Sequence, residues 1–224
     1  MKGFQQLWEE LRKEGKQTAR YPYDKVISFV FRYYPRQKER SEVRILEVGC
    51  GAGNNLWALA MEGFRVYGID GSETAISMAE DTFEKLGLQG EFTVGDFTSQ
   101  LPYPDNFFDL VIDRGSITCV DYEEARRVVS EVRRVLKRGG YFFFNPYART
   151  HTSYTTSSHK LNERFVLTER GPIAGTGYVC FYNKEDVTEI IKEGWEILEL
   201  KELSLVNHID GNVHSEWEVV VRKL

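Results

Sequence analysis

The sequence has little of what defines several large classes of protein. Its three cysteines, Cys50, Cys119 and Cys180, are scattered over 224 residues and form no CxxC pair. This spacing favours neither a disulfide framework nor a zinc site, and we interpret Cys119 and Cys180 as core residues. No apolar run approaches the roughly 20 residues that span a bilayer, and the charged N-terminal segment does not resemble a signal peptide. We therefore expect a cytoplasmic protein with no membrane partner.

Positive charge is also scarce. The chain has 29 Lys and Arg against 34 Asp and Glu, which gives a formal net charge of -5. Proteins that grip nucleic acid need clustered positive charge, so we expect no nucleic-acid partner. Hydrophobic residues make up 42% and charged residues 28% of the chain, which is ordinary for a soluble domain. We expect a single domain over residues 1–224, and the sequence leaves its oligomeric state open.

From residue 43 onward, short strand-like segments alternate with helix-like segments. This order predicts an α/β, Rossmann-like, doubly wound sheet with helices on both faces. A hairpin signal at Asp210-Gly211 joins the last two segments, so the sheet should have seven mostly parallel strands and a C-terminal antiparallel hairpin. The expected strands are residues 43–48, 65–69, 91–94, 107–112, 141–145, 196–205 and 213–222. The expected helices between them are residues 54–62, 72–87, 121–138 and 183–193.

Capping and breaking residues mark several of these boundaries. Ser72 and Asp121 are typical N-cap residues, and Asn183 pairs with Asp186 in the same way. The pair Gly139-Gly140 should break a helix before the fifth strand. Two helices are expected in residues 1–40. The stretch 146–176 is rich in Ser, Thr, Tyr and Gly without a clear period, and a loop of that length is usually functional or mobile.

A glycine-rich turn follows the first strand. It runs Glu47-Val48-Gly49-Cys50-Gly51-Ala52-Gly53, directly before a helix, and Asp70 stands at the end of the second strand. Glycines at alternate positions let a ligand approach the main chain closely, and the helix offers it free N–H groups. A dinucleotide fingerprint would require glycine where Asn54 stands. The carboxylate of Glu47 would oppose a pyrophosphate and suits a cationic ligand.

These residues resemble the first motif of the class I S-adenosylmethionine-dependent methyltransferases, of the small-molecule type. The resemblance covers residues 43–145 in the family's order. It implies that Asp70 binds the ribose hydroxyls of the cofactor and that Asp96, with Phe97 beside it, lies near the adenine. The segments LPYPDNFFDLVID and LKRGGYFFF resemble the family's fourth-strand and fifth-strand segments.

The resemblance divides the chain into a helical lid (1–40), a cofactor-binding core (43–145), a substrate-side insertion (146–182) and a final helix with the hairpin (183–224). It implies S-adenosylmethionine as cofactor and S-adenosylhomocysteine as product. The expected cofactor-binding residues are Glu47, Gly49, Cys50, Gly51, Gly53, Asn54, Asn55, Asp70, Gly71, Ser72, Asp96, Phe97, Asp113 and Arg114. Asn54 and Asn55 could instead cap their helix, and Arg114 could be a solvated loop charge.

On the acceptor side we expect Tyr21, Tyr23, Tyr147 and His151, from the lid and the insertion. No residue is marked as catalytic, because a sulfonium methyl is already activated and a base is needed only for a protonated acceptor. His151 or His214 could supply such a base. His208, Asp210, His214 and Glu216 could together hold a metal, but exposed hairpins have this composition for solubility alone, so we expect none.

The expected function is transfer of the methyl group of S-adenosylmethionine to a small molecule, either a metabolite or a sugar-like acceptor. Two alternatives stay open. One is an oxidoreductase that uses a nicotinamide dinucleotide, and the other is a non-catalytic S-adenosylmethionine sensor.

Overall fold

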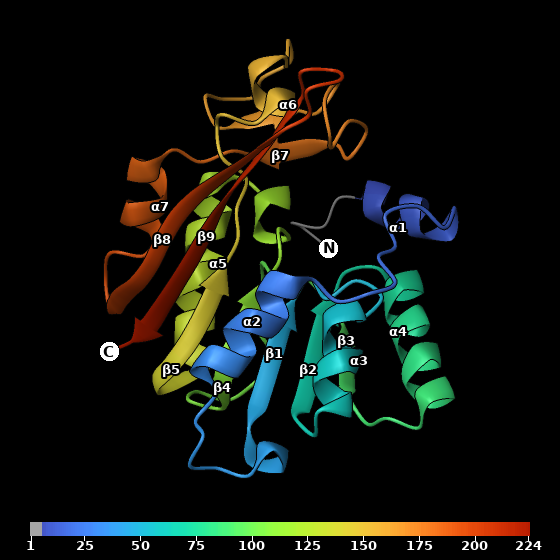
Figure 1. Cartoon of the computed structure of the whole chain (residues 1–224), viewed down its shortest axis with the longest axis vertical. Helices are drawn as coiled ribbons and strands as arrows, with labels where there is room; N and C mark the ends of the chain where they lie inside the picture. Colours follow the sequence, from blue (N-terminus) through green and yellow to red (C-terminus); the bar gives the residue numbers. More distant parts are fainter. Residues whose placement is uncertain (1–5) are drawn as a thin grey trace.

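A seven-stranded sheet with helices on both faces forms the centre of the protein (Figure 1). The computed structural model describes residues 6–224. The strands of this sheet stand in the order β3-β2-β1-β4-β5-β9-β8. They are β1 (Arg44–Val48), β2 (Arg65–Asp70), β3 (Glu91–Val94), β4 (Phe108–Asp113), β5 (Leu136–Phe144), β8 (Trp195–Val206) and β9 (Val213–Lys223). The first five are parallel, and β9 is antiparallel to both β5 and β8, which confirms the expected fold.

The helices cover the sheet in two layers, each with its own core. The helices are α1 (Gln6–Lys13), α2 (Asp24–Tyr33), α3 (Asn54–Met61), α4 (Glu73–Leu86), α5 (Tyr122–Val135), α6 (Thr152–Thr155) and α7 (Lys184–Ile190). Two 3-10 turns, η1 (Arg40–Glu42) and η2 (Ile117–Cys119), complete the set. In β1, Ile45 packs with residues of α2, α3 and α4, whereas Leu46 packs with α5 and α7. Successive strand residues point to opposite faces, so one apolar strand serves both layers.

The boundary between α5 and β5 differs from the expectation. The helix ends at Val135 and the strand begins at Leu136, so Gly139 and Gly140 lie inside the strand. The pairing with β4 jumps from Leu136 to Tyr141, and Gly139 has a φ of 76°. The two glycines therefore form a bulge within a continuous strand. Glycine can adopt a positive φ in a bulge, just as it can at the helix end that was expected here.

The N-caps are confirmed at Ser72, Asp121 and Asn183, each of which accepts a backbone N–H of the first helical turn. The pair Asn183 and Asp186 forms the complete capping box at α7.

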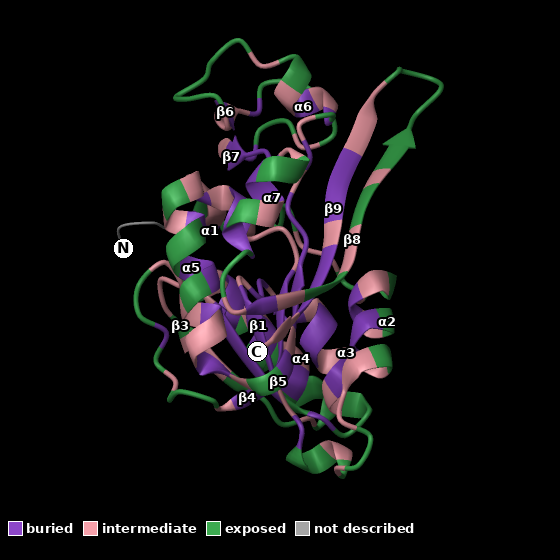
Figure 2. Ribbon diagram, turned by 90° about the vertical axis from the view of Figure 1, so that its left-hand side faces the viewer, coloured by how far each residue is buried: buried purple, intermediate pink, exposed green. Residues whose placement is uncertain are grey.

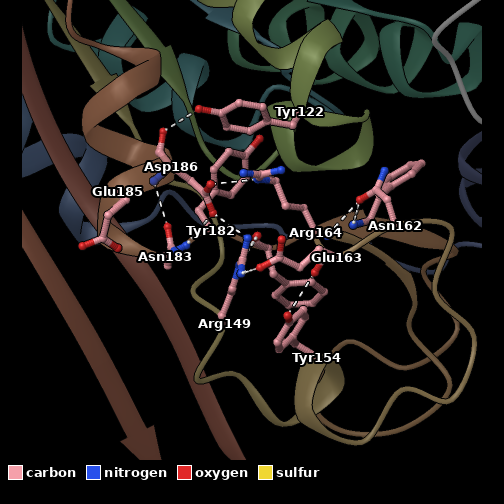
Figure 3. A network of polar contacts seen from close by, with 12 residues as sticks. Tyr122, Arg149, Tyr154, Asn162, Glu163, Arg164, Tyr182, Asn183, Glu185 and Asp186 are labelled. Atoms are coloured by element: carbon pink, nitrogen blue, oxygen red, sulfur yellow. Dashed lines mark hydrogen bonds and ion pairs between the residues drawn. The ribbon is translucent and has the colours of Figure 1, made fainter.

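The insertion has more order than its composition indicates. It contains α6 and a small antiparallel sheet of β6 (Phe165–Leu167) and β7 (Tyr178–Cys180), which Figure 1 shows beyond the carboxyl ends of the parallel strands. Arg149 and Arg164 each donate to the buried carboxylate of Asp186 at the start of α7, at 2.8 Å (Figure 3). These two charge-assisted bonds attach the insertion to the domain.

The hairpin of β8 and β9 extends past the sheet to the insertion. Figure 2 shows β9 largely buried and β8 mostly exposed at the sheet edge. Isolated bridges join Tyr147 to Glu216 and Ala148 to Tyr182, so the insertion begins against the hairpin. Within residues 6–224, no helix has the length and apolar character needed to cross a bilayer.

Candidate active site

A cleft opens at the carboxyl ends of the parallel strands, beside the glycine turn, with about 680 Å³ of empty space that includes open solvent. In sheets of this topology, ligands bind at this edge. Six expected cofactor residues line it, namely Gly49, Asp70, Gly71, Asp96, Phe97 and Arg114. Residues that were not among the expected site residues complete the wall: Trp8, Arg12, Gly95, Gly115, Ser116, Cys119 and Val120.

The three glycines of the turn all have positive φ, but their surroundings differ. A Cβ at Gly49 would lie 2.1 Å from the Cβ of Ser116, so this glycine lets the loop after β4 close against the turn. A Cβ at Gly53 would lie 3.1 Å from the Cβ of Ala79, so Gly53 permits close packing of α3 on α4. At Gly51 the nearest atom is the flexible end of Arg12, at 3.0 Å. Gly51 is thus the glycine whose missing side chain leaves room for the Arg12 guanidinium, whereas Gly49 lines the cleft itself.

Asp70 connects the turn to the next helix. Its two carboxylate oxygens accept the backbone N–H of Gly51 at 2.8 Å and of Ser72 at 2.9 Å. Burial raises the pKa of Asp70, and these hydrogen bonds oppose the shift. A carboxylate has about four acceptor positions, so two remain for a ligand.

Glu47 lies below the turn and is 2% exposed. Its Oε1 accepts a hydrogen bond of 2.6 Å from Asn55, while no donor among the described residues reaches its buried Oε2. Burial, together with the negative charges of Asp113 and Asp70, outweighs the bond from Asn55 and raises the pKa of Glu47 to about 8. At neutral pH this carboxyl is therefore mostly protonated, and a cation in the cleft would favour its ionised form.

Asn54 and Asn55 hold the segment that precedes α2. Asn54 donates to the carbonyl of Tyr21 at 3.0 Å, and Asn55 accepts the N–H of Tyr23 at 2.9 Å. Neither side chain caps α3, whose N-cap is Gly53. The helix-capping interpretation is thus wrong for both, because the backbone of this crossing segment occupies their polar groups.

Two other expected cofactor residues have structural surroundings. The side chain of Cys50 is buried in the core, with Sγ 2.6 Å from the position of a Cβ at Gly68. Ser72 is buried as the N-cap of α4. By contrast, Cys119 is a wall residue of the cleft and not the core residue that the sequence suggested. It lies in η2, a turn that the hydrophobic pattern did not reveal.

The loop after β4 supplies the side of the cleft that faces the insertion. Asp113 is fully buried and its Oδ1 accepts the N–H groups of Ser116 and Ile117, so it shapes this loop. The Arg114 guanidinium lies 4.2 Å from the centre of the Tyr23 ring and 3.5 Å from Glu216. Arg114 is therefore a packed and paired residue of the wall, which excludes the solvated-charge interpretation.

The expected acceptor-side tyrosines differ in their placement. Tyr21 is 68% exposed, so its ring points to solvent. Tyr23 stacks under Arg114 at the mouth of the cleft. The hydroxyl of Tyr147 lies 3.8 Å from the position of a Cβ at Gly115, and burial raises its pKa to about 12. Tyr147 thus reaches the cleft wall as a neutral phenol.

The structure brings His151 and His214 together, although 63 positions separate them. Nε2 of His151 lies 3.3 Å from Nδ1 of His214, and Nε2 of His214 lies 3.2 Å from Glu216. The N–H of Ser153 donates to Nδ1 of His151, so the proton of the neutral His151 ring is on Nε2 and points to His214. Nε2 of His214 faces Glu216, and an N–H at this nitrogen can donate to the carboxylate.

The pKa values of His151 and Glu216 are both lowered, which disfavours the charged form of the histidine and favours that of the carboxylate. His151 is completely buried, and burial with the neighbouring His214 lowers its pKa to about 4. Burial opposes the ionisation of Glu216, but the bond from His214 and the charges of Arg114 and Lys25 outweigh it and lower its pKa to about 2. Both ring nitrogens of His151 are engaged, so the structure gives no support to His151 as a base. No group of three or more His, Cys, Asp or Glu in the described chain has the arrangement of a metal site.

Comparisons with known proteins agree with this geometry. Residues 45–140 match the family model of a methyltransferase domain. A solved S-adenosylmethionine-dependent methyltransferase of Methanosarcina mazei superposes with a TM-score of 0.73 at 25% identity, over 91% of this chain and 99% of that one. Residues 45–140 are thus a methyltransferase domain, with the fold of the S-adenosylmethionine-dependent methyltransferases. Two features of the site fit that cofactor. Gly49, Asp70 and Asp96 line the cleft where the strands end, and the buried, unpaired Oε2 of Glu47 below the turn favours a cation nearby.

The curated relatives of this methyltransferase have diverse acceptors. The ajmaline N-methyltransferase of Rauvolfia serpentina is 29% identical over 63% of this chain and 48% of its own length. The tRNA N(3)-cytidine methyltransferase of Gallus gallus is 28% identical over 66% of this chain and 41% of its own length. The chain thus spans about half the length of such relatives, and their names do not agree on a substrate class.

Proposed function

We propose that this chain transfers the methyl group of S-adenosylmethionine to a small-molecule acceptor, a metabolite or a sugar-like compound. The observation that carries the proposal is the cleft itself, which has a bare glycine turn at its base and carboxylates around it. Small-molecule sites are concave and have a few convergent polar groups, as Asp70, Asp96 and Arg114 provide here.

Different residues would bind different parts of the cofactor. Asp70 has two acceptor positions left for the ribose hydroxyls, and Asp96 and Phe97 line the part of the wall assigned to the adenine. Glu47 lies below the turn, behind the lining of the cleft, and its ionised form would favour the ammonium group through its charge. The cofactor supplies a methyl group that is activated by its sulfonium. The protein's contribution is to hold donor and acceptor in line and exclude water, which can contribute roughly 7–11 kcal/mol.

The acceptor side is built from Tyr23, Arg114 and Tyr147. Tyr147 is a neutral hydroxyl at the wall, and Arg114 is held between its ion pair with Glu216 and the Tyr23 ring. These groups can orient a polar acceptor by hydrogen bonds. Glu216, which forms the ion pair with Arg114, is also contacted by His214. Both ring nitrogens of His151 are in hydrogen-bond contact, so neither is available for proton transfer.

The test is the release of S-adenosylhomocysteine over a panel of amines, phenols, thiols, carboxylic acids and sugar nucleotides, with total tRNA as a separate arm. Turnover of a small molecule supports the proposal, whereas methylation of tRNA alone would contradict it. Binding of the cofactor without turnover of any of these would favour the sensor. A titration with nicotinamide dinucleotide tests the oxidoreductase, for which we expect no binding because Asn54 replaces the packing glycine and Glu47 opposes the pyrophosphate.

A further inference from the structure

Helix α1 closes one side of the cleft, although it is far in sequence from the glycine turn. Trp8 and Arg12, one helical turn apart, both line the cavity, and Figure 1 shows α1 beside the carboxyl ends of β2 and β3, over α4. Residues at positions i and i+4 share one face of a helix, so α1 presents this pair to the cleft as a unit.

Glu9 attaches this helix to α4. Its carboxylate accepts the hydroxyl of Ser72 at 2.5 Å, the hydroxyl of Thr74 at 2.7 Å and the N–H of Thr74 at 3.3 Å. The bond from Ser72 and those from Thr74 outweigh burial and lower the pKa of Glu9 to about 2. A carboxylate at a helix N-terminus also interacts favourably with the helix dipole. The contact places Arg12 over the cleft rather than in solvent.

The Arg12 guanidinium lies at the point where the glycine turn is bare. Its Nη2 is 3.0 Å from the position of a Cβ at Gly51, and Asp70 is the charged group that most strongly favours its ionised form. Burial lowers the pKa of Arg12, but a guanidinium stays charged at any physiological pH. A fixed positive charge therefore stands in a cleft that otherwise suits a cation.

The cofactor has one anionic group, the carboxylate of its amino-acid end, and this group needs a cation close to the glycine turn. Arg114 is the other arginine of the wall, but it is paired with Glu216 and packed on Tyr23. Arg12 is above Gly51, where the amino-acid end would lie if Asp70 holds the ribose and Glu47 the ammonium. We infer that Arg12 binds the carboxylate of the cofactor's amino-acid end and that Glu9 positions it through α1; the inference rests on the proposed cofactor site.

Two ligands that differ only in this end separate the roles. S-adenosylhomocysteine contains the amino-acid carboxylate, whereas 5′-methylthioadenosine has the nucleoside and thioether without it. We expect Arg12→Gln to weaken the binding of S-adenosylhomocysteine by roughly 10- to 100-fold, which is the size of one charge-assisted interaction. The affinity for methylthioadenosine should change less than twofold, and calorimetry measures both. Lys16→Gln is the matched control, because Lys16 is 65% exposed, pairs with the exposed Glu14 rather than with Glu9, and its loss removes the same charge.

Other outcomes would overturn the inference. An equal loss for both ligands would mean that Arg12 acts on the nucleoside or on the fold, and unchanged affinities would mean that it touches neither. A gain for both would mean that Arg12 only blocks the cleft. Failure of the wild-type protein to bind S-adenosylhomocysteine would instead contradict the cofactor site itself. Circular dichroism of each variant checks that the fold is retained.

Discussion

Asn55 donates to one oxygen of Glu47 at 2.6 Å, and the other oxygen of Glu47 is buried with no donor among the described residues. A carboxyl in this state holds its proton, and its pKa is raised to about 8. The same pair links the glycine turn to the segment before α2, because Asn55 also accepts the N–H of Tyr23. We therefore expect the charge of Glu47 to respond to a cation bound beside the turn.

We predict that cofactor binding at pH 7 releases close to one proton. The cationic amino-acid end favours the ionised form of Glu47, which is mostly protonated in the unliganded cleft. Calorimetry in buffers of different ionisation enthalpy measures the release, and Glu47→Gln should abolish it. A release that persists in this variant would assign the proton to another group.

The same residue sets a pH dependence of stability. The pKa of Glu47 is raised in the folded state from 4.5 to about 8, so the folded protein binds this proton more tightly. Its contribution to stability is then fully present below about pH 4.5 and is lost as the pH rises to 8. Thermal unfolding of the unliganded protein should show this loss. The unfolding temperature of Glu47→Gln should vary less with pH across the same range.

The contribution of His151 to stability has the opposite pH dependence. Burial lowers its folded pKa from 6.5 to about 4, so its contribution to stability is present above pH 6.5 and is lost as the pH falls to 4. The variant His151→Asn keeps an acceptor for the N–H of Ser153 and removes the ionisable ring. We expect its unfolding temperature to vary less than that of the wild type between pH 6.5 and 4. Identical profiles would contradict the lowered pKa of His151.

Gly51→Ala should abolish cofactor binding and leave the protein folded. The new Cβ meets only the end of the Arg12 side chain, which can move, but it fills space above the turn. Its positive φ of 53° costs roughly 1–2 kcal/mol of stability. Gly139→Ala is the control, since Gly139 has a φ of 76° with no atom within 4 Å of a new Cβ and lies in the β5 bulge. Tight binding by Gly51→Ala would refute the assignment.

Asp70→Asn should weaken cofactor binding by roughly 10- to 100-fold, because its amide nitrogen would face one of two N–H donors and the ribose would lose an acceptor. The unfolding temperature should fall as well, since Asp70 holds both Gly51 and Ser72. Asp81→Asn, an exposed change on α4, is the control for charge. Unchanged affinity by calorimetry would show that Asp70 does not bind the ribose.

Much of this protein could be predicted from local pattern. The apolar strands, the N-caps at Ser72 and Asn183, and the glycine turn depend on neighbours a few residues away, and the structure confirms them. The bulge at Gly139 was not predicted, because glycine with a positive φ is compatible with both a helix end and a strand bulge.

The sequence by itself determined the sheet, the turn and the carboxylates that stand beside it, since these follow from hydrophobic periodicity and backbone sterics. Only the tertiary structure decided that Arg12 reaches Gly51 and that His151 meets His214, over 63 positions. Such contacts depend on how whole elements pack, and no local pattern marks which distant side chains will share a cavity. The bond between Glu9 and Ser72 is of the same kind, because it forms only when α1 lies on α4.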